Sequence, residues 1–245
     1  MSTNIDTKNL IFGRNPVKEA FKANRVVSVY VIENFSHKEI LDYINSSKVK
    51  VTKVTPKELD NICQGVHQGI AANIKPYNYV SLEEIAAKPS KIPNRTPVIL
   101  LLDGINDPQN LGAILRSADI FGVSGVVIPK HNQVQLNAIV AKTSAGAINY
   151  VPVALVSNLN QAAEYLKQRG FWTVASDGSA SMNYQDIKYD FPVALIIGSE
   201  GNGVSRLLKE RSDYVIKIPM QGHVNSLNVS VATGIILSMI RNWNY

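Results

Sequence analysis

The chain has 245 residues, enough for one large domain or for a small domain joined to a medium one. With 45% hydrophobic and 18% charged residues its composition is globular, and its apolar runs are too short for a membrane span. The net charge of +6 favours a polyanionic partner, and Cys63, the only cysteine, excludes an internal disulfide or a thiolate metal cluster.

The first 75 residues alternate between helix-like and strand-like segments. This segment holds eleven Lys and Arg against seven Asp and Glu, whereas the remaining 170 residues hold fourteen against twelve. We therefore expect residues 1–75 to form a small three-layer α/β domain that contacts the polyanion. The predicted helices span residues 15–24, 36–47 and 56–63, and the predicted strands span residues 26–32, 49–55 and 69–74.

Four basic residues at the first predicted helix are candidates for contact with the polyanion: Arg14, Lys18, Lys22 and Arg25. Lys18 and Lys22 are four residues apart, which places them on one face of the helix. If the polyanion is a nucleic acid such as RNA, these residues would contact its phosphates without reading its sequence. The alternative is an ordinary solvated helix.

Residues 76–97 contain four prolines and one short helix candidate, residues 81–87, which is typical of an interdomain linker. From residue 98 onward, short apolar runs alternate with helical segments. Such runs indicate a parallel sheet covered by helices on both faces, and we expect this second domain to span residues 98–245. Its predicted strands are residues 98–103, 125–129, 151–156, 171–176, 193–198 and 214–219.

Ligands of such sheets bind beyond the carboxyl ends of the strands, and three of these ends carry unusual sequence. DGINDPQN follows the first strand and leads into a helix that begins near Asn110, in which Arg116 is the only charge of the stretch LGAILRSA. GSEGNG follows the fifth strand and places glycines around Glu200. PMQGHVNSLN follows the sixth strand and leads into a long apolar helix that begins at Ser226 or Asn228.

Each of these segments has a plainer explanation when it is taken alone. Arg116 would be a surface or ion-paired arginine, and Glu200 an acidic residue at a helix start. Asn225, Ser226 and Asn228 would be helix caps. The glycine pattern matches neither the dinucleotide fingerprint nor the P-loop.

Together and in this order, the three segments resemble the signature motifs of the SpoU, or TrmH-type, family of RNA ribose 2′-O-methyltransferases in the SPOUT superfamily. The first motif is an Asn-to-Arg pair, here Asn110 and Arg116, and the second is the turn from Gly198 to Gly201. The third is SLNVS, here residues 226–230. GRNPV, VHQGI and AKTSAGA extend the resemblance, which is closest to the RlmB-like bacterial branch that methylates a guanosine of 23S rRNA.

This resemblance implies a C-terminal α/β domain tied into a deep trefoil knot, a small N-terminal α/β RNA-binding domain, and S-adenosylmethionine as cofactor. It also implies that the substrate is structured RNA, with rRNA favoured over other RNAs. Members of the family form homodimers in which each active site is completed across the interface, and the same is expected here. The residues that would hold the cofactor are Gly198, Glu200, Gly201, Ile218, Met220, Ser226 and Leu227.

The resemblance also assigns the reaction to Arg116, Asn110, Glu200 and Asn228. The family usually gives Arg116 the role of base, but a guanidinium with a pKa above about 12 is a poor base. We expect Arg116 to bind the phosphate next to the target ribose and to stabilise alkoxide charge, with proton removal as the alternative. Glu200 and Asn228 would orient Arg116 or the hydroxyl, and Asn110 would shape the loop.

Three other functions are weighed against this one. A tRNA 2′-O-methyltransferase shares the chemistry, and an RNA-binding relative without catalysis shares the fold. An adenine-dinucleotide oxidoreductase would need a glycine fingerprint and an acidic ribose partner that the sequence lacks. The histidines show no metal-ligand spacing, and the polar N-terminus lacks a signal peptide, which predicts a metal-independent cytoplasmic protein.

Overall fold

The structure, a computed structural model, describes residues 9–63, 65–223 and 226–241. The chain divides into two compact units, the first comprising Met1–Tyr77 with Leu136–Asn149 and the second Asn78–Gln135 with Tyr150–Tyr245. The division predicted from the sequence, with a linker over residues 76–97, stays a prediction.

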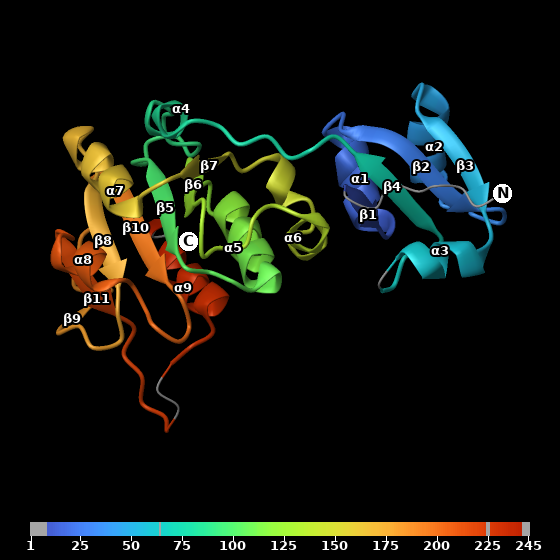
Figure 1. Cartoon of the computed structure of the whole chain (residues 1–245). Helices are drawn as coiled ribbons and strands as arrows, with labels where there is room; N and C mark the ends of the chain where they lie inside the picture. Colours follow the sequence, from blue (N-terminus) through green and yellow to red (C-terminus); the bar gives the residue numbers. More distant parts are fainter. Residues whose placement is uncertain (1–8, 64, 224–225, 242–245) are drawn as a thin grey trace. The chain divides into compact units, whose positions relative to one another are not determined.

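The first unit contains a four-stranded sheet with the strand order β1-β4-β2-β3 (Figure 1). Only β2 and β3 are parallel; the other two pairs are antiparallel. Every element predicted in this unit is present. Strand β1 was not predicted, because its three residues are too few to give a periodic signal. The elements are β1 (Leu10–Phe12), α1 (Arg14–Lys22), β2 (Val26–Ile32), α2 (Lys38–Ser46), β3 (Lys50–Val54), α3 (Pro56–Ile62), β4 (Ile70–Ile74), α6 (Ala138–Thr143) and the 3-10 turn η1 (Ala147–Asn149).

Helix α3 closes one side of this sheet. It begins at Pro56, after Thr55, whose side chain and that of Glu58 form a reciprocal capping box. Its apolar face joins a buried cluster that includes Tyr30 and Cys63. Cys63 is buried, and burial raises the pKa of its thiol to about 11, so this cysteine acts as a small buried hydrophobe.

The second unit contains a seven-stranded sheet in which all neighbours are parallel, with the order β7-β6-β5-β10-β8-β11-β9. The predicted parallel sheet is therefore confirmed, and within the described part of this sheet only the two-residue β9 was not indicated by the sequence pattern. The strands are β5 (Val98–Asp103), β6 (Gly125–Pro129), β7 (Val153–Val156), β8 (Trp172–Ser176), β9 (Met182–Asn183), β10 (Val193–Gly198) and β11 (Tyr214–Lys217). The helices are α4 (Leu82–Ala86), α5 (Pro108–Ile120), α7 (Leu159–Gln168), α8 (Arg206–Glu210) and α9 (Val229–Arg241).

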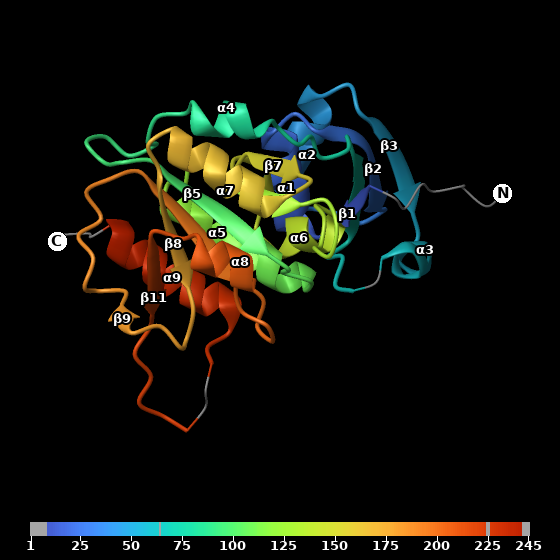
Figure 2. The same ribbon diagram turned by 60° about the vertical axis from the view of Figure 1, so that its left-hand side comes forward.

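Helices cover both faces of the larger sheet (Figures 1 and 2). Alternate residues of a strand point to opposite faces. Ile99 and Leu101 of β5 pack in a cluster with α4, α7 and α8. The fully buried Leu100 and Leu102 therefore face the other side, where α5 and α9 pack against each other. Among the described residues no helix is both long enough and apolar enough to cross a bilayer. The predicted knot stays a prediction.

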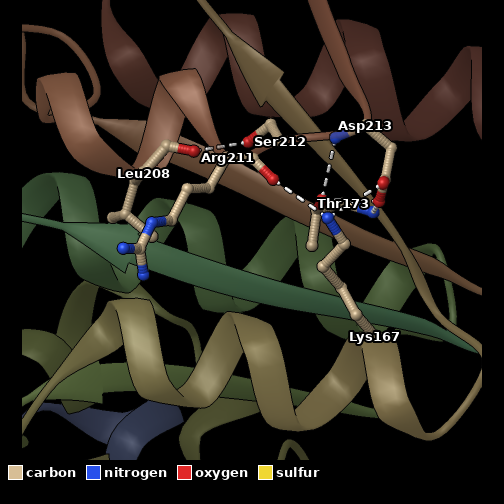
Figure 3. A network of polar contacts seen from close by, with 6 residues as sticks. All are labelled: Lys167, Thr173, Leu208, Arg211, Ser212 and Asp213. Atoms are coloured by element: carbon tan, nitrogen blue, oxygen red, sulfur yellow. Dashed lines mark hydrogen bonds and ion pairs between the residues drawn. The ribbon is translucent and has the colours of Figure 1, made fainter.

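A polar network joins the beginnings of β8 and β11 (Figure 3). The Asp213 carboxylate accepts hydrogen bonds from the Thr173 N–H, at 2.8 Å, and hydroxyl, at 2.7 Å. Its other oxygen lies 2.9 Å from the Lys167 ammonium group. Burial alone would raise the pKa of Asp213, but the hydrogen bonds from Thr173 and Lys167 outweigh it and lower the pKa.

We expect Asp213→Ala to lower the free energy of unfolding by about 1–3 kcal/mol, because the Thr173 donors lose their acceptor. Folding lowers the pKa of Asp213, so its carboxylate contributes to the free energy of unfolding at pH values above the usual aspartate pKa. This contribution is lost as the pH falls through the pKa of Asp213 in the folded protein. Urea unfolding at pH 7 and at acidic pH measures both effects.

The matched control is Asp190→Ala, which removes an exposed ion pair with Lys188. That substitution should leave the free energy of unfolding almost unchanged, because an ion pair between exposed side chains is screened by solvent. Equal effects of the two substitutions would contradict a stabilising role for Asp213.

Candidate active site

The site lies at the carboxyl edge of the seven-stranded sheet. Because the strands are parallel, the segments that follow β5, β8, β10 and β11 all leave the sheet at this edge. The register pairs Gly198, the last residue of β10, with Asp103, the last residue of β5. The polar segments predicted at the strand ends therefore meet in space.

After β10 the chain makes a tight turn that returns to the end of the strand. The Gly203 N–H donates to the Ser199 carbonyl, at 2.9 Å, and the two residues form an isolated bridge. A Cβ built on Gly198 would lie 1.9 Å from the carbonyl carbon of Gly203, so position 198 requires glycine. Helix α8 begins only at Arg206, so the explanation of Glu200 as a helix-start residue is wrong.

Glu200, within this turn, joins the three motifs. Its Oε1 atom accepts a hydrogen bond from Asn110 Nδ2, at 3.1 Å, and one from Asn228 Nδ2, at 2.7 Å. The Val229 N–H donates to the same oxygen at 3.3 Å. Asn228 Nδ2 also lies 2.9 Å from Asn110 Oδ1. Three of the four residues that the resemblance assigns to the reaction thus form one hydrogen-bonded cluster.

The two asparagines reach Glu200 from the beginnings of two helices. Asn228 caps α9, and its Oδ1 accepts hydrogen bonds from the Ser230 N–H and hydroxyl, at 2.9 and 2.6 Å. It is therefore both a cap and a member of the cluster. Helix α5 begins at Pro108 with Asp107 as its cap, slightly earlier than predicted, and this leaves the Asn110 amide free for Glu200. Asn225 lies outside the described residues.

Arg116 stands apart from this cluster. It is exposed, six residues along α5 from Asn110, and no hydrogen bond or ion pair joins it to another described residue. Six residues correspond to a rise of about 9 Å and to a different helix face. The structure therefore brings Asn110, Glu200 and Asn228 together but does not bring Arg116 to them within one chain.

A cavity of about 300 Å³ adjoins the turn. This volume lies at the lower end of the range of small-molecule sites. Of the residues predicted to hold a cofactor, only Gly201 does not line the cavity; the lining includes Gly198, Glu200, Ile218, Met220, Ser226 and Leu227.

Sequence reasoning missed the part of the cavity wall that follows β8. Ser176, Asp177 and Gly178 line it, as does Asn202 of the turn. The available signal was their position, because β8 also ends at the ligand-binding edge, next to β10. No motif drew attention to the three residues that follow β8.

The four basic residues of the first unit have different surroundings. Arg14 is exposed, and its backbone N–H donates to the Gln68 side chain. Lys18 pairs with Glu39 at 3.4 Å, and Lys22 pairs with Glu19 at 3.0 Å. The Arg25 guanidinium lies over the Tyr77 ring and donates to the Lys75 carbonyl. An RNA phosphate would therefore compete with existing partners at three of these residues.

Residues 97–238 match the SpoU rRNA Methylase family, and residues 10–80 match the family described as RNA 2′-O ribose methyltransferase substrate binding. The first match covers more than half of the chain and contains the whole Glu200 cluster. The chain therefore belongs to the SpoU/TrmH family of RNA methyltransferases.

Known proteins similar to the chain agree with this assignment. A protein of Staphylococcus saprophyticus, named as belonging to the TrmH family of tRNA/rRNA methyltransferases, is 42% identical over 96% of both chains. The AdoMet-bound rRNA methyltransferase from Sinorhizobium meliloti has the same fold, with a TM-score of 0.80, 22% identity and coverage of 96% of this chain and 87% of that one. A crystal structure of an RNA 2′-O ribose methyltransferase has a TM-score of 0.79, 25% identity and coverage of 96% and 89%.

We expect Gly198→Ala to destabilise the protein by about 1–3 kcal/mol or more, because the new methyl group would overlap the backbone of Gly203. Gly201→Ala is the matched control, since a Cβ there meets no atom within 4 Å. Urea unfolding of both variants measures the difference. Similar free energies of unfolding would show that the turn does not need the close approach at Gly198.

Proposed function

We propose that this protein transfers a methyl group from S-adenosylmethionine to a ribose 2′-hydroxyl in structured RNA. The observation that carries the proposal is the Glu200 cluster, which joins the three motif segments beside a cavity of about 300 Å³. The named activities of the similar proteins support the same cofactor and the same reaction.

The cavity suits an S-adenosyl group. Ile218, Met220 and Leu227 offer it apolar surface, and Ser226 offers a hydroxyl. Met220 and Leu227 are 40% and 37% exposed, and a bound nucleoside would cover this apolar surface. When it is bound, S-adenosylmethionine supplies a methyl group that its positive sulfur already activates.

The residues of the chain then have to align the ribose hydroxyl and stabilise the charge that develops on its oxygen. Glu200 and Asn228 hold each other in place and would orient the hydroxyl or the Arg116 guanidinium at the cavity mouth. Asn110 would fix the loop after β5. Arg116 would bind the phosphate next to the target ribose as a bidentate donor, a role that suits an exposed guanidinium better than proton removal does.

A homodimer would explain why Arg116 stands apart from the cluster. The surface of α5 and α9 contains an apolar groove, lined by Ile120, Phe121, Val231 and Ile235 among others. Ile120 is 63% exposed and Val231 is 50% exposed, which is unusual for such side chains on neighbouring helices. Ile120 follows Arg116 by one helical turn. A second copy on this groove would bring its Arg116 towards the Glu200 cluster.

The proposed substrate is a guanosine of 23S rRNA, methylated in the cytoplasm and held by Arg14, Lys18, Lys22 and Arg25 of the first unit. The match of residues 10–80 to a substrate-binding family supports a folded RNA-binding domain. A tRNA substrate is the alternative, since the Staphylococcus relative is named for both RNAs. An RNA-binding protein without catalysis is the less favoured alternative, because the chain has all four residues assigned to the reaction: Asn110, Arg116, Glu200 and Asn228.

Mapping of 2′-O-methyl groups in RNA from cells with and without the gene tests the substrate. We expect one position in 23S rRNA to lose its methyl group without the gene and to regain it when the wild-type gene is returned. Return of an Asn228→Ala gene controls for effects of the protein other than methylation. Loss of a tRNA methyl group instead would select the alternative substrate.

We expect Arg116→Lys and Arg116→Ala each to slow single-turnover RNA methylation by about a hundredfold or more, because an ammonium group cannot replace a bidentate guanidinium. Binding of S-adenosylhomocysteine should stay unchanged, since Arg116 does not line the cavity. A near wild-type rate for the Arg116→Lys variant would contradict the bidentate role.

A mixing experiment tests whether Arg116 serves the partner's site. Arg116→Ala and Asn228→Ala subunits are each expected to be inactive alone. Mixed dimers would regain one complete site if Arg116 acts across the interface, and would stay inactive if it acts within its own chain.

A further inference from the structure

One carboxylate of the cavity wall takes no part in the Glu200 cluster. Asp177 follows β8 directly and lines the cavity, with its side chain 14% exposed. Its Oδ1 atom accepts hydrogen bonds from the Ser179 N–H, at 2.8 Å, and hydroxyl, at 2.5 Å. Its Oδ2 atom accepts one from the Lys209 ammonium group, at 2.7 Å. The carboxylate is therefore held in one orientation.

The position of Asp177 is set by the register of the sheet. Ala175 of β8 is aligned with Ile196 of β10, so Asp177 and Gly198, each two residues further along, leave the sheet side by side. A Cβ built on Gly203 would lie 3.8 Å from Asp177 Oδ2. Asp177 Oδ2 thus lies close to the glycine-rich turn that lines the same cavity.

Asp177 retains the capacity to bind a ligand. A carboxylate oxygen can accept about two hydrogen bonds, and Lys209 supplies only one to Oδ2. The hydrogen bonds from Lys209 and Ser179 lower the pKa of Asp177 to about 2, so at neutral pH the group is ionised and acts only as an acceptor. A donor group of the ligand would complete its shell.

The ion pair with Lys209 restricts what that donor can be. A second ammonium group next to Oδ2 would be repelled by Lys209, whereas a neutral hydroxyl would not. In other parallel sheets, a carboxylate near a glycine-rich turn at this edge binds a ribose hydroxyl. We propose that Asp177 accepts a hydrogen bond from a ribose hydroxyl of the bound S-adenosyl ligand and selects for an intact ribose.

This inference rests on the proposed function, because it takes the cavity to be the S-adenosyl site. The test measures binding of S-adenosylhomocysteine and of its 2′-deoxy and 3′-deoxy analogues by isothermal titration to the full chain. We expect the wild-type protein to bind at least one deoxy analogue about tenfold more weakly than S-adenosylhomocysteine, the effect of losing one hydrogen bond to a charged group. Asp177→Ala should bind all three ligands with similar, lowered affinity.

Lys209→Met is the matched control, since it breaks the ion pair but leaves the carboxylate. The Lys209→Met variant should still bind the deoxy analogue more weakly than S-adenosylhomocysteine. If Lys209→Met and Asp177→Ala both lose this preference, the ion pair acts only by shaping the site, and the proposal is overturned. Discrimination that survives in Asp177→Ala would overturn it as well. If Asp177→Ala does not fold, Asp177→Asn replaces it. Its neutral amide oxygen still accepts a hydrogen bond but a weaker one, so the preference for the intact ribose should fall below the wild-type value, and an unchanged preference would overturn the proposal.

Binding of S-adenosylhomocysteine to the wild-type protein distinguishes failure of the Asp177 role from failure of the proposed function. A wild-type protein that binds S-adenosylhomocysteine without any preference for the hydroxyls would overturn the role of Asp177 and leave the proposed function intact. A wild-type protein that does not bind S-adenosylhomocysteine would overturn both.

Discussion

The Glu200 carboxylate connects parts of the chain that lie 90 and 28 residues from it. A single oxygen accepts hydrogen bonds from the first turn of α5, from the cap of α9 and from the first N–H of α9. It can do so only because the turn that holds it folds back onto the end of β10, and that requires the backbone contact between Gly198 and Gly203. The position of both helix starts at the cavity depends on this one turn.

The caps of α5 and α9 leave the side-chain amides of Asn110 and Asn228 available to Glu200. Asp107 accepts the Gln109 N–H at the start of α5, and Asn228 accepts the Ser230 N–H at the start of α9, whereas Glu200 accepts the Val229 N–H. Asn110 and Asn228 are then available to bind the carboxylate. Polar groups that are fixed in this way lose little entropy when a ligand binds, which is the physical basis of preorganisation.

Strand β8 has a carboxylate–lysine pair at each end, and the two pairs differ in what adjoins them. Asp213 and Lys167 lie at its beginning, next to a space of only about 10 Å³, too small for a ligand. Asp177 and Lys209 pair beyond its end, where Asp177 lines a cavity of about 300 Å³. The same pairing of charges therefore stabilises the contact between neighbouring strands in one place and holds a carboxylate at a cavity in the other.

The sequence by itself determined the six main strands of the second unit, because short apolar runs that alternate with helical segments are typical of strands buried on both faces of a parallel sheet. It also placed Asn110, Glu200 and Asn228 at strand ends, and family resemblance predicted their common role. It could not determine that one Glu200 oxygen accepts from both asparagines, that Arg116 lies outside their cluster, or that Asp177 lines the same cavity. Those facts depend on strand order and register, which set residues far apart in the chain side by side and leave no local signal in the sequence.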